Sequence, residues 1–419
     1  MNIAVTDIKD RLYYIANILI VFYGFSLVFS HKISTKIALV LLLIWIVTGD
    51  FKDKFKNIVS DKFILIFLLY IGLFLIGLLW TEDIKAGLHI AKRPLLLLIV
   101  PIIYTLYQKR FIKIQFYSLV VGLIVTSILI IGAYYNFINI KYNAAHAPFM
   151  NRNYIATMLA FSASFLLYML LSTKRLFQNL LIGIVIIITI YALTITASRG
   201  GLLILLIGFF IVLIYRFGIS FKKVFMALIV TALTFILIYN SNDTIKHRID
   251  NTVKVLKKFD LNKQVSTHKG RTALTCRFEF WYYAYNIGKN KPLLGAGTGD
   301  GIAELENYIG KKETKKLFSR CRGNGSGQFN PHNMILFMFM QFGLVGLFLI
   351  LYFAYLHFKV AYSSKYVPLI LFVTTSWIFL LTSSALFTTR FFIPYYGFGF
   401  VILYLIYKEY YSNEVSHNK

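Results

Sequence analysis

Long apolar runs separated by short polar segments make up most of the chain. Residues 180–190, for example, are apolar on every face, whereas the strands of a membrane β-barrel alternate apolar and polar residues. A helix needs about 20 apolar residues to cross the hydrocarbon core of a bilayer. On that measure the sequence predicts about twelve transmembrane helices, at residues 12–30, 37–49, 62–80, 86–107, 114–135, 153–172, 178–197, 200–217, 222–240, 332–358, 366–386 and 390–408.

One hydrophilic stretch interrupts this series and divides the chain into three parts. Residues 1–240 would hold nine transmembrane helices, residues 241–331 a large loop, and residues 332–419 three more transmembrane helices and a tail. Apolar residues at helical spacing predict short loop helices at 242–258, 277–287 and 301–318. The glycine-rich residues 295–301 and 323–327 are typical of turns or mobile connections. The predicted fold class is therefore an all-α polytopic membrane protein.

Composition and charge support this prediction. Of 419 residues, 58% are hydrophobic and 15% charged, which excludes a single soluble core. A net charge of +27 would suit nucleic acid, but the cations lie in short clusters between apolar runs. Cytoplasmic loops and sites for anionic lipid substrates also need such an excess. We therefore expect membrane lipids, and no nucleic acid, as partners.

The distribution of Lys and Arg predicts the orientation. They are about twice as frequent in the short loops of one side as in the spans and short loops opposite, and the richer side is normally cytoplasmic. Both termini would then be cytoplasmic, with the loop 241–331 on the periplasmic face. The first apolar run is too long to be a cleaved signal peptide.

Both cysteines of the chain, Cys276 and Cys321, belong to this loop. In an oxidising periplasm they could form a disulfide, which we favour. The alternative is two free thiols, because the sequence does not fix the distance between them.

Three arginines on the predicted outer side are candidates for binding phosphate groups, because the guanidinium group matches phosphate oxygens. Arg199 lies in the turn Ser198-Arg199-Gly200-Gly201, where glycines permit a sharp bend and the close approach of a ligand. Arg277 is expected at the start of an aromatic helix, where the helix N-terminus would add donors to an anion site. Arg390 lies at the outer start of the last span. The alternatives are interfacial anchoring for Arg199 and Arg390, and pairing with Glu279 or Asp300 for Arg277.

His332 is the candidate base. Pro331 is expected to mark the start of the tenth span, which places His332 at its outer end. A neutral imidazole there can take a proton from a hydroxyl group at physiological pH. A lone histidine at a membrane surface is more often structural, but the outer arginines favour a base beside a phosphate site.

Other polar residues carry weaker signals. Lys92 and Arg93 lie inside a span and need a partner, and Arg152 stands in a segment that caps the sixth span. We assign no role to His146 or His268. Asp300 and Glu304 are expected on a solvated helix face.

The aromatic loop residues and the missing motifs complete the picture. Five aromatic side chains could line a sugar path, although helix packing is the simpler role for most of them; they are Phe278, Phe280, Trp281, Tyr282 and Tyr283. No metal-ligand cluster, phosphate-binding loop or hydrolase serine motif occurs in the sequence, so no metal or cofactor is expected.

The pattern resembles the bacterial O-antigen ligase and polymerase superfamily of membrane glycosyltransferases. The resemblance rests on the expected span layout with one large outer loop, the Ser198–Gly201 turn, residues 277–292, and His332-Asn333. Nine residues separate Asn333 from Gly343-Leu344-Val345-Gly346, which is similar to the glycine-spaced end of the ligase pattern.

The resemblance implies a GT-C-like fold in the bacterial inner membrane and a periplasmic active site. The donor would be a glycan on undecaprenyl diphosphate, and the acceptor a hydroxyl group of lipid A-core. The essential histidine of the family would correspond to His332, and its essential arginines to Arg199 and Arg277. The reaction would need no metal and would invert the anomeric centre.

Three other functions remain open at this point. A repeat-unit polymerase would use a second lipid-linked glycan as acceptor, and a protein O-oligosaccharyltransferase would use a serine or threonine. A flippase or permease for lipid-linked glycans would share the spans and the cations but would not need His332.

Overall fold

The computed structural model describes residues 2–138, 150–241, 243–257, 260, 272–321 and 329–412. Every regular element in these ranges is helical, which confirms the all-α prediction. His146 and His268, and the glycine-rich residues 323–327, lie outside the described ranges.

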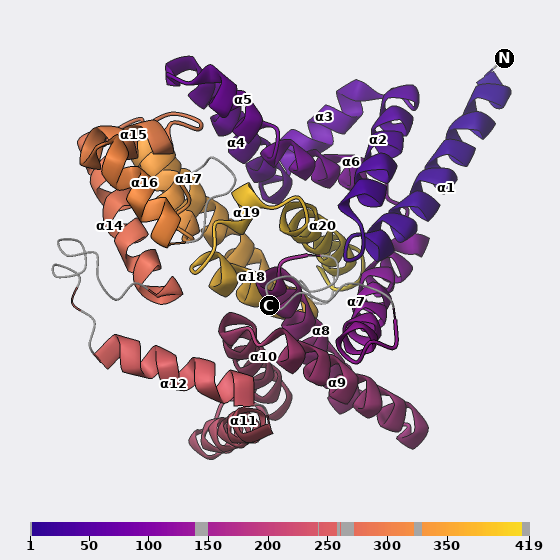
Figure 1. Cartoon of the computed structure of the whole chain (residues 1–419). Helices are drawn as coiled ribbons and strands as arrows, with labels where there is room; N and C mark the ends of the chain where they lie inside the picture. Colours follow the sequence, from indigo (N-terminus) through magenta and orange to yellow (C-terminus); the bar gives the residue numbers. More distant parts are fainter. Residues whose placement is uncertain are drawn as a thin grey trace.

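The first part of the chain contains the helices α1 to α7 (Figure 1). Their bounds are α1 Asn2–Ser26, α2 His31–Val47, α3 Phe51–Ser60, α4 Lys62–Ile76, α5 Ile84–Ala91, α6 Ile99–Leu106 and α7 Ile112–Tyr134. Short 3-10 helices connect some of them, at η1 Gly77–Trp80, η2 Pro94–Leu98 and η3 Lys109–Phe111.

The helices of the remaining chain begin with four long apolar ones. They are α8 Arg152–Ser172, α9 Leu176–Thr196, α10 Arg199–Phe217 and α11 Phe221–Ser241. Four shorter helices follow, α12 Asp243–Lys257, α14 Ala273–Asn290, α15 Gly301–Ile309 and α16 Lys311–Arg320. The chain then returns to apolar helices, α17 Met334–Ser364, α18 Val367–Leu380, α19 Ala385–Thr388 and α20 Phe392–Tyr410.

Among the described residues, length and hydropathy qualify eight helical segments as membrane spans, or up to nine if the bent pair α2 and α3 is one span. The structure supports a multi-pass membrane protein, while the count of about twelve spans stays a prediction. The span predicted at 86–107 corresponds to the qualifying segment Ile84–Leu106, although this segment consists of α5, η2 and α6 around Pro94 and is not one α-helix. The single loop helix predicted at 301–318 is wrong, because two helices separated by Gly310 lie there. Proline lacks the backbone N–H that a continuous helix needs, and Gly310 has a positive φ of 85°.

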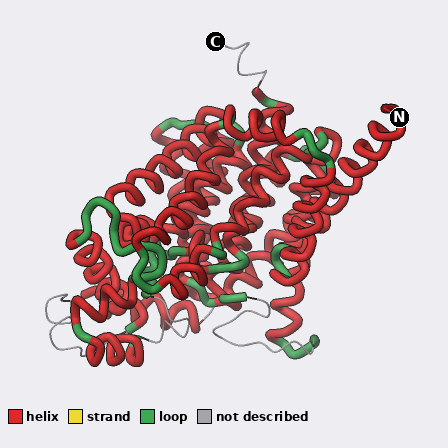
Figure 2. The backbone as a smooth tube through the Cα atoms, turned by 90° about the horizontal axis from the view of Figure 1, so that it is seen from above, coloured by secondary structure: helices red, strands yellow, loops and turns green. Residues whose placement is uncertain are grey.

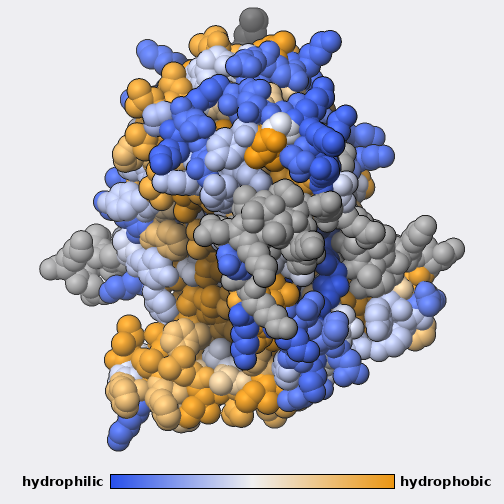
Figure 3. Space-filling model, turned by 60° about the vertical axis from the view of Figure 1, so that its left-hand side comes forward, coloured by the Kyte–Doolittle hydropathy of each residue, from blue (hydrophilic) through white to orange (hydrophobic). Residues whose placement is uncertain are grey.

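The core of the bundle lies around α20, which Figure 1 draws in yellow near the centre. All residues of α20 from Phe392 to Ile406 are buried, and α18 is buried over nearly all of its length. In contrast, only Ala227 and Ile238 of α11 are buried, and most of its apolar side chains are exposed. The face in Figure 3 has hydrophobic surface in its lower left part, while hydrophilic surface dominates the upper part and the lower right. This is the distribution expected when part of the surface contacts lipid.

The long helix α17 is interrupted at Gly343, which has φ 56° and ψ −144°. An inserted segment, residues 292–300, fills the interruption. The backbone N–H groups of Ala296 and Gly297 donate to the carbonyl groups of Met340 and Gln341, and Leu344 N–H donates to the carbonyl group of Pro292. Backbone groups that the break in α17 leaves unpaired are thus satisfied from another part of the chain.

Backbone hydrogen bonds hold the inserted segment, so of the two alternatives predicted for 295–301, a turn or a mobile connection, the structure favours the turn. Gly295, Gly297 and Gly299 all have positive φ, and a Cβ on Gly295 would lie 2.4 Å from the backbone nitrogen of Phe342. Only glycine combines this backbone conformation with such a close approach.

Asp300, at the end of the inserted segment, is buried and does not lie on a solvated helix face as predicted. Asp300 is 1% exposed, and its carboxylate accepts hydrogen bonds from the backbone N–H groups of Glu82 (2.6 Å) and Asp83 (3.1 Å). Burial raises the pKa of Asp300 above its usual value. Glu304 forms an ion pair with Lys291 at 2.5 Å. The expectation that Asp300 and Glu304 share a solvated helix face is therefore wrong, because long-range backbone contacts recruit Asp300.

Figure 2 draws the first turns of α1 and the end of α20 toward the same end of the bundle, and the short helices of residues 273–320 at the opposite end. The cavity described next is formed at that opposite end, where α8, α10 and α14 begin and α18 finishes.

Candidate functional site

A cavity of about 340 Å³ brings together three of the predicted site residues, Arg199, Arg277 and His332. Its walls come from α8, α10, α12, α14, the segment before α17 and the end of α18. We call it the cationic cavity, because its lining contains four arginines and, among the described residues, no carboxylate. The lining residues are Asn151, Arg152, Asn153, Tyr154, Ala197, Ser198, Arg199, Gly200, Leu203, Arg248, Thr252, Ala273, Leu274, Arg277, His332, Phe379, Thr382 and Ser383.

Arg199 is the first residue of α10 and is exposed. The bend before it is made by Ala197, which has the left-handed φ of 48°, and not by the glycines as the sequence suggested. The Ser198 side chain caps α10 by accepting from the Gly201 N–H, and it donates to the Asn153 side chain at 3.0 Å. The guanidinium group of Arg199 donates to the Thr252 hydroxyl of α12.

The two glycines after Arg199 have different surroundings. A Cβ on Gly201 would lie 2.5 Å from the Ala156 Cβ of α8, whereas a Cβ on Gly200 would meet nothing within 4 Å. Gly201 therefore allows α10 to pack closely on α8, which holds the Arg199 turn beside the start of α8.

Arg277 lies one turn inside α14 and not at its first residue. The helix begins at Ala273, with Thr272 as its N-cap and a reciprocal bond between Thr272 and Thr275. The alternative of pairing with Asp300 is not found, and that carboxylate accepts instead from the backbone N–H groups of Glu82 and Asp83. No ion pair in the described part of the chain joins Arg277 to Glu279. Burial lowers the pKa of Arg277, and the positive charge of Arg199 lowers it further.

His332 lies before α17 in a segment that several elements hold. The helix begins at Met334 with Asn333 as its N-cap, so Pro331 does not mark the helix start as predicted. The Trp281 indole N–H of α14 donates to the Pro331 carbonyl group at 2.7 Å. The Asn333 side chain donates to the Leu381 carbonyl group at 2.9 Å, beyond the end of α18.

The backbone at His332 is itself unusual. It has a positive φ of 53°, and its N–H donates to the Asn330 side chain at 2.8 Å. A left-handed backbone at a residue other than glycine is sparsely populated and often occurs at functional sites.

The surroundings of His332 keep its imidazole neutral. Burial, and to a smaller extent the positive charge of Arg277, lower the pKa of His332 to about 4. At neutral pH the ring can therefore accept a proton. An anion bound beside Arg277 would offset that positive charge and raise the pKa of His332 toward its ordinary value, which would make the ring a stronger base.

Two further arginines that the sequence analysis did not select line the cavity. Arg152 is the first residue of α8, which Asn151 caps, and Arg248 on α12 donates to the Ala197 carbonyl group at 3.0 Å. A signal for Arg248 was present in the sequence, because His247, Asn251 and Thr252 place polar side chains near it at helical spacing.

The remaining cation candidates lie outside this lining. Arg390 is exposed and precedes α20 next to Phe391, whose ring contacts His31 of α2 with centroids 5.1 Å apart. Arg93 lies between α5 and η2, and its guanidinium group is 3.3 Å from His89. Lys92 is the C-cap residue of α5. The structure therefore does not bring Arg390, Lys92 or Arg93 into the cationic cavity.

A disulfide links Cys276 of α14 to Cys321 at the end of α16, with Cα atoms 5.7 Å apart. It joins the turn that precedes Arg277 to the segment that leads back toward His332. The aromatic residues of α14 mainly pack: Phe280 and Tyr283 are buried, and Phe280 makes edge contacts with Phe318 and Phe329.

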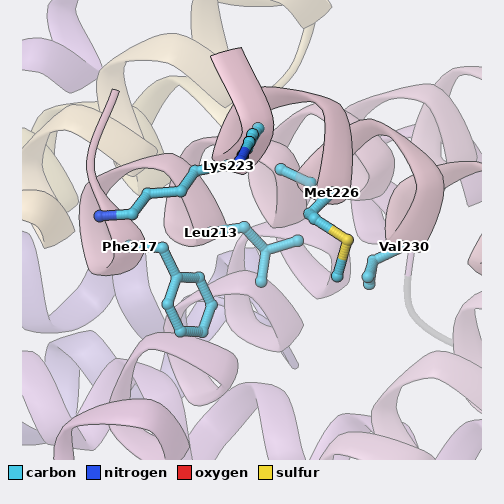
Figure 4. A pocket seen from close by; sticks show the side chains of 7 residues that line it. Leu213, Phe217, Lys223, Met226 and Val230 are labelled. Atoms are coloured by element: carbon cyan, nitrogen blue, oxygen red, sulfur yellow. The ribbon is translucent and has the colours of Figure 1, made fainter. Parts of the chain in front are cut away.

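A second large cavity, of about 360 Å³, has a different character (Figure 4). It lies between α10 and α11, and its walls are apolar except for Lys222 and Lys223. It offers no base for a hydroxyl group, so the cationic cavity is the better candidate for chemistry. Within the described residues, no three His, Cys, Asp or Glu side chains gather as a metal site would require.

Comparison with known families gives a match over residues 184–351 to a family model described as O-antigen ligase. This region includes Arg199, Arg277 and His332. The resemblance to the O-antigen ligase superfamily is confirmed. Members of the O-antigen ligase family are glycosyltransferase-like membrane enzymes with lipid-linked glycan substrates. Among curated proteins, no match to the chain was found.

Proposed function

We propose that the protein is an O-antigen ligase that transfers a glycan from undecaprenyl diphosphate to a hydroxyl group of lipid A-core. The observation that carries this proposal is the placement of a neutral histidine and several arginines in one cavity, to which the described residues contribute no carboxylate. A diphosphate donor needs fixed cations, and a hydroxyl acceptor needs a base that is unprotonated at neutral pH.

Arg199 and Arg277 are the proposed ligands of the donor diphosphate. Both line the cavity, and the lowered pKa of Arg277 reflects burial together with the charge of Arg199. A bound anion would relieve that repulsion and form charge-assisted hydrogen bonds with the guanidinium groups. Arg390 is left out of this role because it lies outside the lining.

The proposed reaction is a displacement at the anomeric carbon. The acceptor oxygen attacks from the face opposite the diphosphate, so a new C–O bond forms while the bond to the diphosphate oxygen breaks. His332 takes the hydroxyl proton, and undecaprenyl diphosphate leaves with both electrons of the broken bond. The anomeric configuration is inverted.

The arginines would act on the leaving group. Its negative charge grows as the bond breaks, and fixed guanidinium groups in a partly buried cavity stabilise the transition state more than the ground state. A diphosphate stabilised in this way leaves without protonation, which agrees with a metal-independent mechanism.

The location that we propose is the bacterial inner membrane. Both termini would be cytoplasmic and the cavity periplasmic. The cation distribution supports this orientation, and a disulfide between Cys276 and Cys321 is compatible with an oxidising compartment.

A transfer assay with purified protein tests the proposal. It would use undecaprenyl-diphosphate glycan and lipid A-core, with EDTA present, and would compare wild type with His332→Ala and with His89→Gln. His89 is an exposed histidine outside the cavity lining, so His89→Gln controls for the loss of an imidazole. We expect product from wild type and His89→Gln, and a loss of about 100-fold or more in His332→Ala.

Other products would identify the alternatives. Lengthening of the lipid-linked glycan without lipid A-core product would indicate a polymerase, and transfer to serine or threonine a protein O-oligosaccharyltransferase. Movement of the lipid-linked glycan across vesicles, with no transfer and no dependence on His332, would indicate a flippase.

A further inference from the structure

The cavity of about 360 Å³ between α10 and α11, which we call the apolar cavity, lies at the other end of α10 from the cationic cavity (Figure 4). Arg199, the first residue of α10, lines the cationic cavity, whereas Phe217, its last residue, lines the apolar cavity. At 1.5 Å per residue these positions are about 27 Å apart along the helix, close to the thickness of the hydrocarbon core. The apolar cavity therefore lies at the level of the opposite membrane leaflet.

The apolar cavity is closed toward the protein and open outward. Leu213 of α10 and Ala227 of α11 are only 9% and 5% exposed and form its floor, whereas Phe217, Met226 and Val230 are exposed and form its rim. Figure 4 shows the side chains of α10 and α11 facing one another across this space. Most other apolar side chains of α11 are exposed as well, so the cavity opens on a surface suited to contact with lipid.

Two lysines stand at one end of the apolar cavity. Lys222 and Lys223 belong to the first turn of α11 and line the cavity together with the apolar side chains. Figure 4 shows the Lys223 ammonium group on the side away from Val230. From Lys222 to Val230 the helix advances by about 12 Å at 1.5 Å per residue. The cavity thus has a cationic end and an apolar length of about two helical turns.

The surroundings of this end are strongly positive. The sequence contains no Asp or Glu between Asp83 and Asp243, a stretch that includes all of α10 and α11. Within the described part of the chain, no ion pair involves Lys222 or Lys223. Arg216 adds a third cation in the last turn of α10. An anionic group at this end of the cavity would meet complementary charge.

We propose that the apolar cavity binds an anionic phospholipid of the leaflet opposite to the cationic cavity. The phosphate group would contact Lys222 and Lys223, and one acyl chain would lie along α11 toward Val230. Lysine stems lie along apolar surface with their charge at the interface, and basic pockets between transmembrane helices bind anionic head groups. The inference does not depend on the proposed function, because it gives the lipid no part in the reaction.

A second copy of the chain would fit this surface less well. Two copies in a membrane share one orientation, so a symmetric interface on α11 would bring the lysines of both copies to the same depth. Like charges would then face one another, and the sequence from 84 to 242 has no acid to separate them. An anionic lipid meets the same surface with opposite charge.

Photo-crosslinking tests which lipid occupies the cavity. The full chain would be reconstituted in phosphatidylcholine vesicles with a trace of either phosphatidylglycerol or phosphatidylcholine that carries the same diazirine-bearing acyl chain. Mass spectrometry would then map the labelled residues. Label on Leu213 and Ala227 is the decisive readout, because these residues are buried and a lipid that only passes over the rim would not reach them.

We expect phosphatidylglycerol to label Leu213 and Ala227 at least about tenfold more than phosphatidylcholine does, because each lysine near an anionic head group contributes about fivefold. The second half of α11 is the internal reference. Its exposed Leu233 and Leu237 do not line the cavity and have no lysine beside them in the helix, so both lipids should label them about equally.

Lys222→Gln combined with Lys223→Gln removes the cationic end. The preference for phosphatidylglycerol should fall to about twofold or less. The matched control is Lys174→Gln combined with Arg175→Gln, which removes two exposed cations from the turn between α8 and α9, outside the cavity lining. It should keep the wild-type preference. Lys223 also lies near the C-cap Gly218 of α10, but loss of a favourable charge at a helix end would change stability and not the preference between lipids.

Val230→Trp tests the acyl chain part of the site. A larger side chain at this exposed rim position would fill part of the cavity, so the label on Leu213 from phosphatidylglycerol should fall by at least about fivefold. Leu233→Trp is the control, because Leu233 is exposed on the same helix and does not line the cavity. It should leave the label on Leu213 unchanged.

Equal labelling of Leu213 and Ala227 by both lipids would overturn the inference, as would a preference that survives loss of both lysines. Absence of label on these residues with either lipid would overturn it too. Formation of a disulfide-linked dimer by Met226→Cys would then assign the surface to a second copy. None of these readouts needs transfer activity, so their failure would leave the ligase proposal standing.

Discussion

The inserted segment and the cationic cavity differ in how their polar groups are paired. In the inserted segment, the backbone groups at the break in α17 are paired, and buried Asp300 accepts two amide bonds. In the cationic cavity, four arginines line one space without a carboxylate from the described residues. The first arrangement stabilises the fold, and the second gathers positive charge beside His332.

This difference indicates that the contacts that position the site are separate from the residues that line it. Rigid, fully paired backbone contacts beside α17 fix the position of α14, which carries Arg277, relative to the segment that carries His332. Because the positioning contacts lie outside the cavity, the cavity can keep cations that would by themselves destabilise the fold.

The largest effect that we expect comes from Arg277→Gln. Loss of a buried guanidinium group beside the departing diphosphate should reduce kcat about 100- to 1,000-fold. The apparent melting temperature should stay the same or rise, because one of several repelling cations is removed. Transfer kinetics and a thermal melt of the same preparation would check both parts.

Arg390→Gln is the control for this substitution, because Arg390 is an exposed arginine outside the cavity lining. It should change kcat by about threefold or less. A marked loss of thermal stability in Arg277→Gln would show that Arg277 supports the fold. The cationic cavity would then stabilise the fold as the inserted segment does.

Gly343→Ala should lower the stability of the protein, in contrast to Arg277→Gln. The φ of Gly343 is 56°, and a Cβ there would lie 2.5 Å from the Pro292 carbonyl oxygen. The left-handed backbone and the displaced carbonyl group should together lower the free energy of unfolding by about 2 kcal/mol or more. A lower apparent melting temperature would be the readout.

Gly200→Ala provides the comparison for Gly343→Ala. No atom lies within 4 Å of a Cβ at Gly200, which belongs to α10, so the melting temperature should be unchanged or slightly higher. Equal destabilisation by the two substitutions would mean that the break in α17 is not a special point of the fold.

The smallest effect concerns pH. Because the pKa of His332 is lowered to about 4, its ring becomes protonated only near that pH. The acid limb of kcat/KM, which reports the free enzyme, should therefore lie near pH 4 and well below 6.5. Arg277→Gln removes a nearby positive charge, favours the protonated ring and should move the limb to higher pH.

Recovery of full activity after return to neutral pH would exclude acid unfolding in this experiment. A limb near pH 6.5 in wild type, unchanged in Arg277→Gln, would contradict the electrostatic coupling of Arg277 to His332.

Several features of the site could be predicted from sequence alone. Apolar runs located the long helices, and an ionisable residue next to an apolar run pointed to Arg199, Arg277 and His332, which the structure brings to one cavity. Each of these residues has a local signal, either a turn, an aromatic helix or a proline.

The other features depend on contacts between distant residues. Arg152 and Arg248 reach the cavity only because α8, α10 and α12 meet there. The sequence of a helix does not indicate which other helices pack against it. The glycines of residues 295–299 do indicate an unusual backbone, but their partners Met340 and Gln341 are more than forty residues later. The sequence therefore left a turn and a mobile connection open where the fold has a turn held by distant backbone groups.

The interruption of α17 also bears on the order in which the protein can be assembled. The residues that complete this helix, 292–300, precede it in the chain, so the ribosome has made them before Gly343 is added. The carbonyl groups of Met340 and Gln341 can thus find their donors as soon as α17 forms. If the gene were rearranged so that the inserted segment followed α17, the carbonyl groups of Met340 and Gln341 would have no donors from that segment while α17 enters the membrane. They would be paired only after the inserted segment had been synthesised.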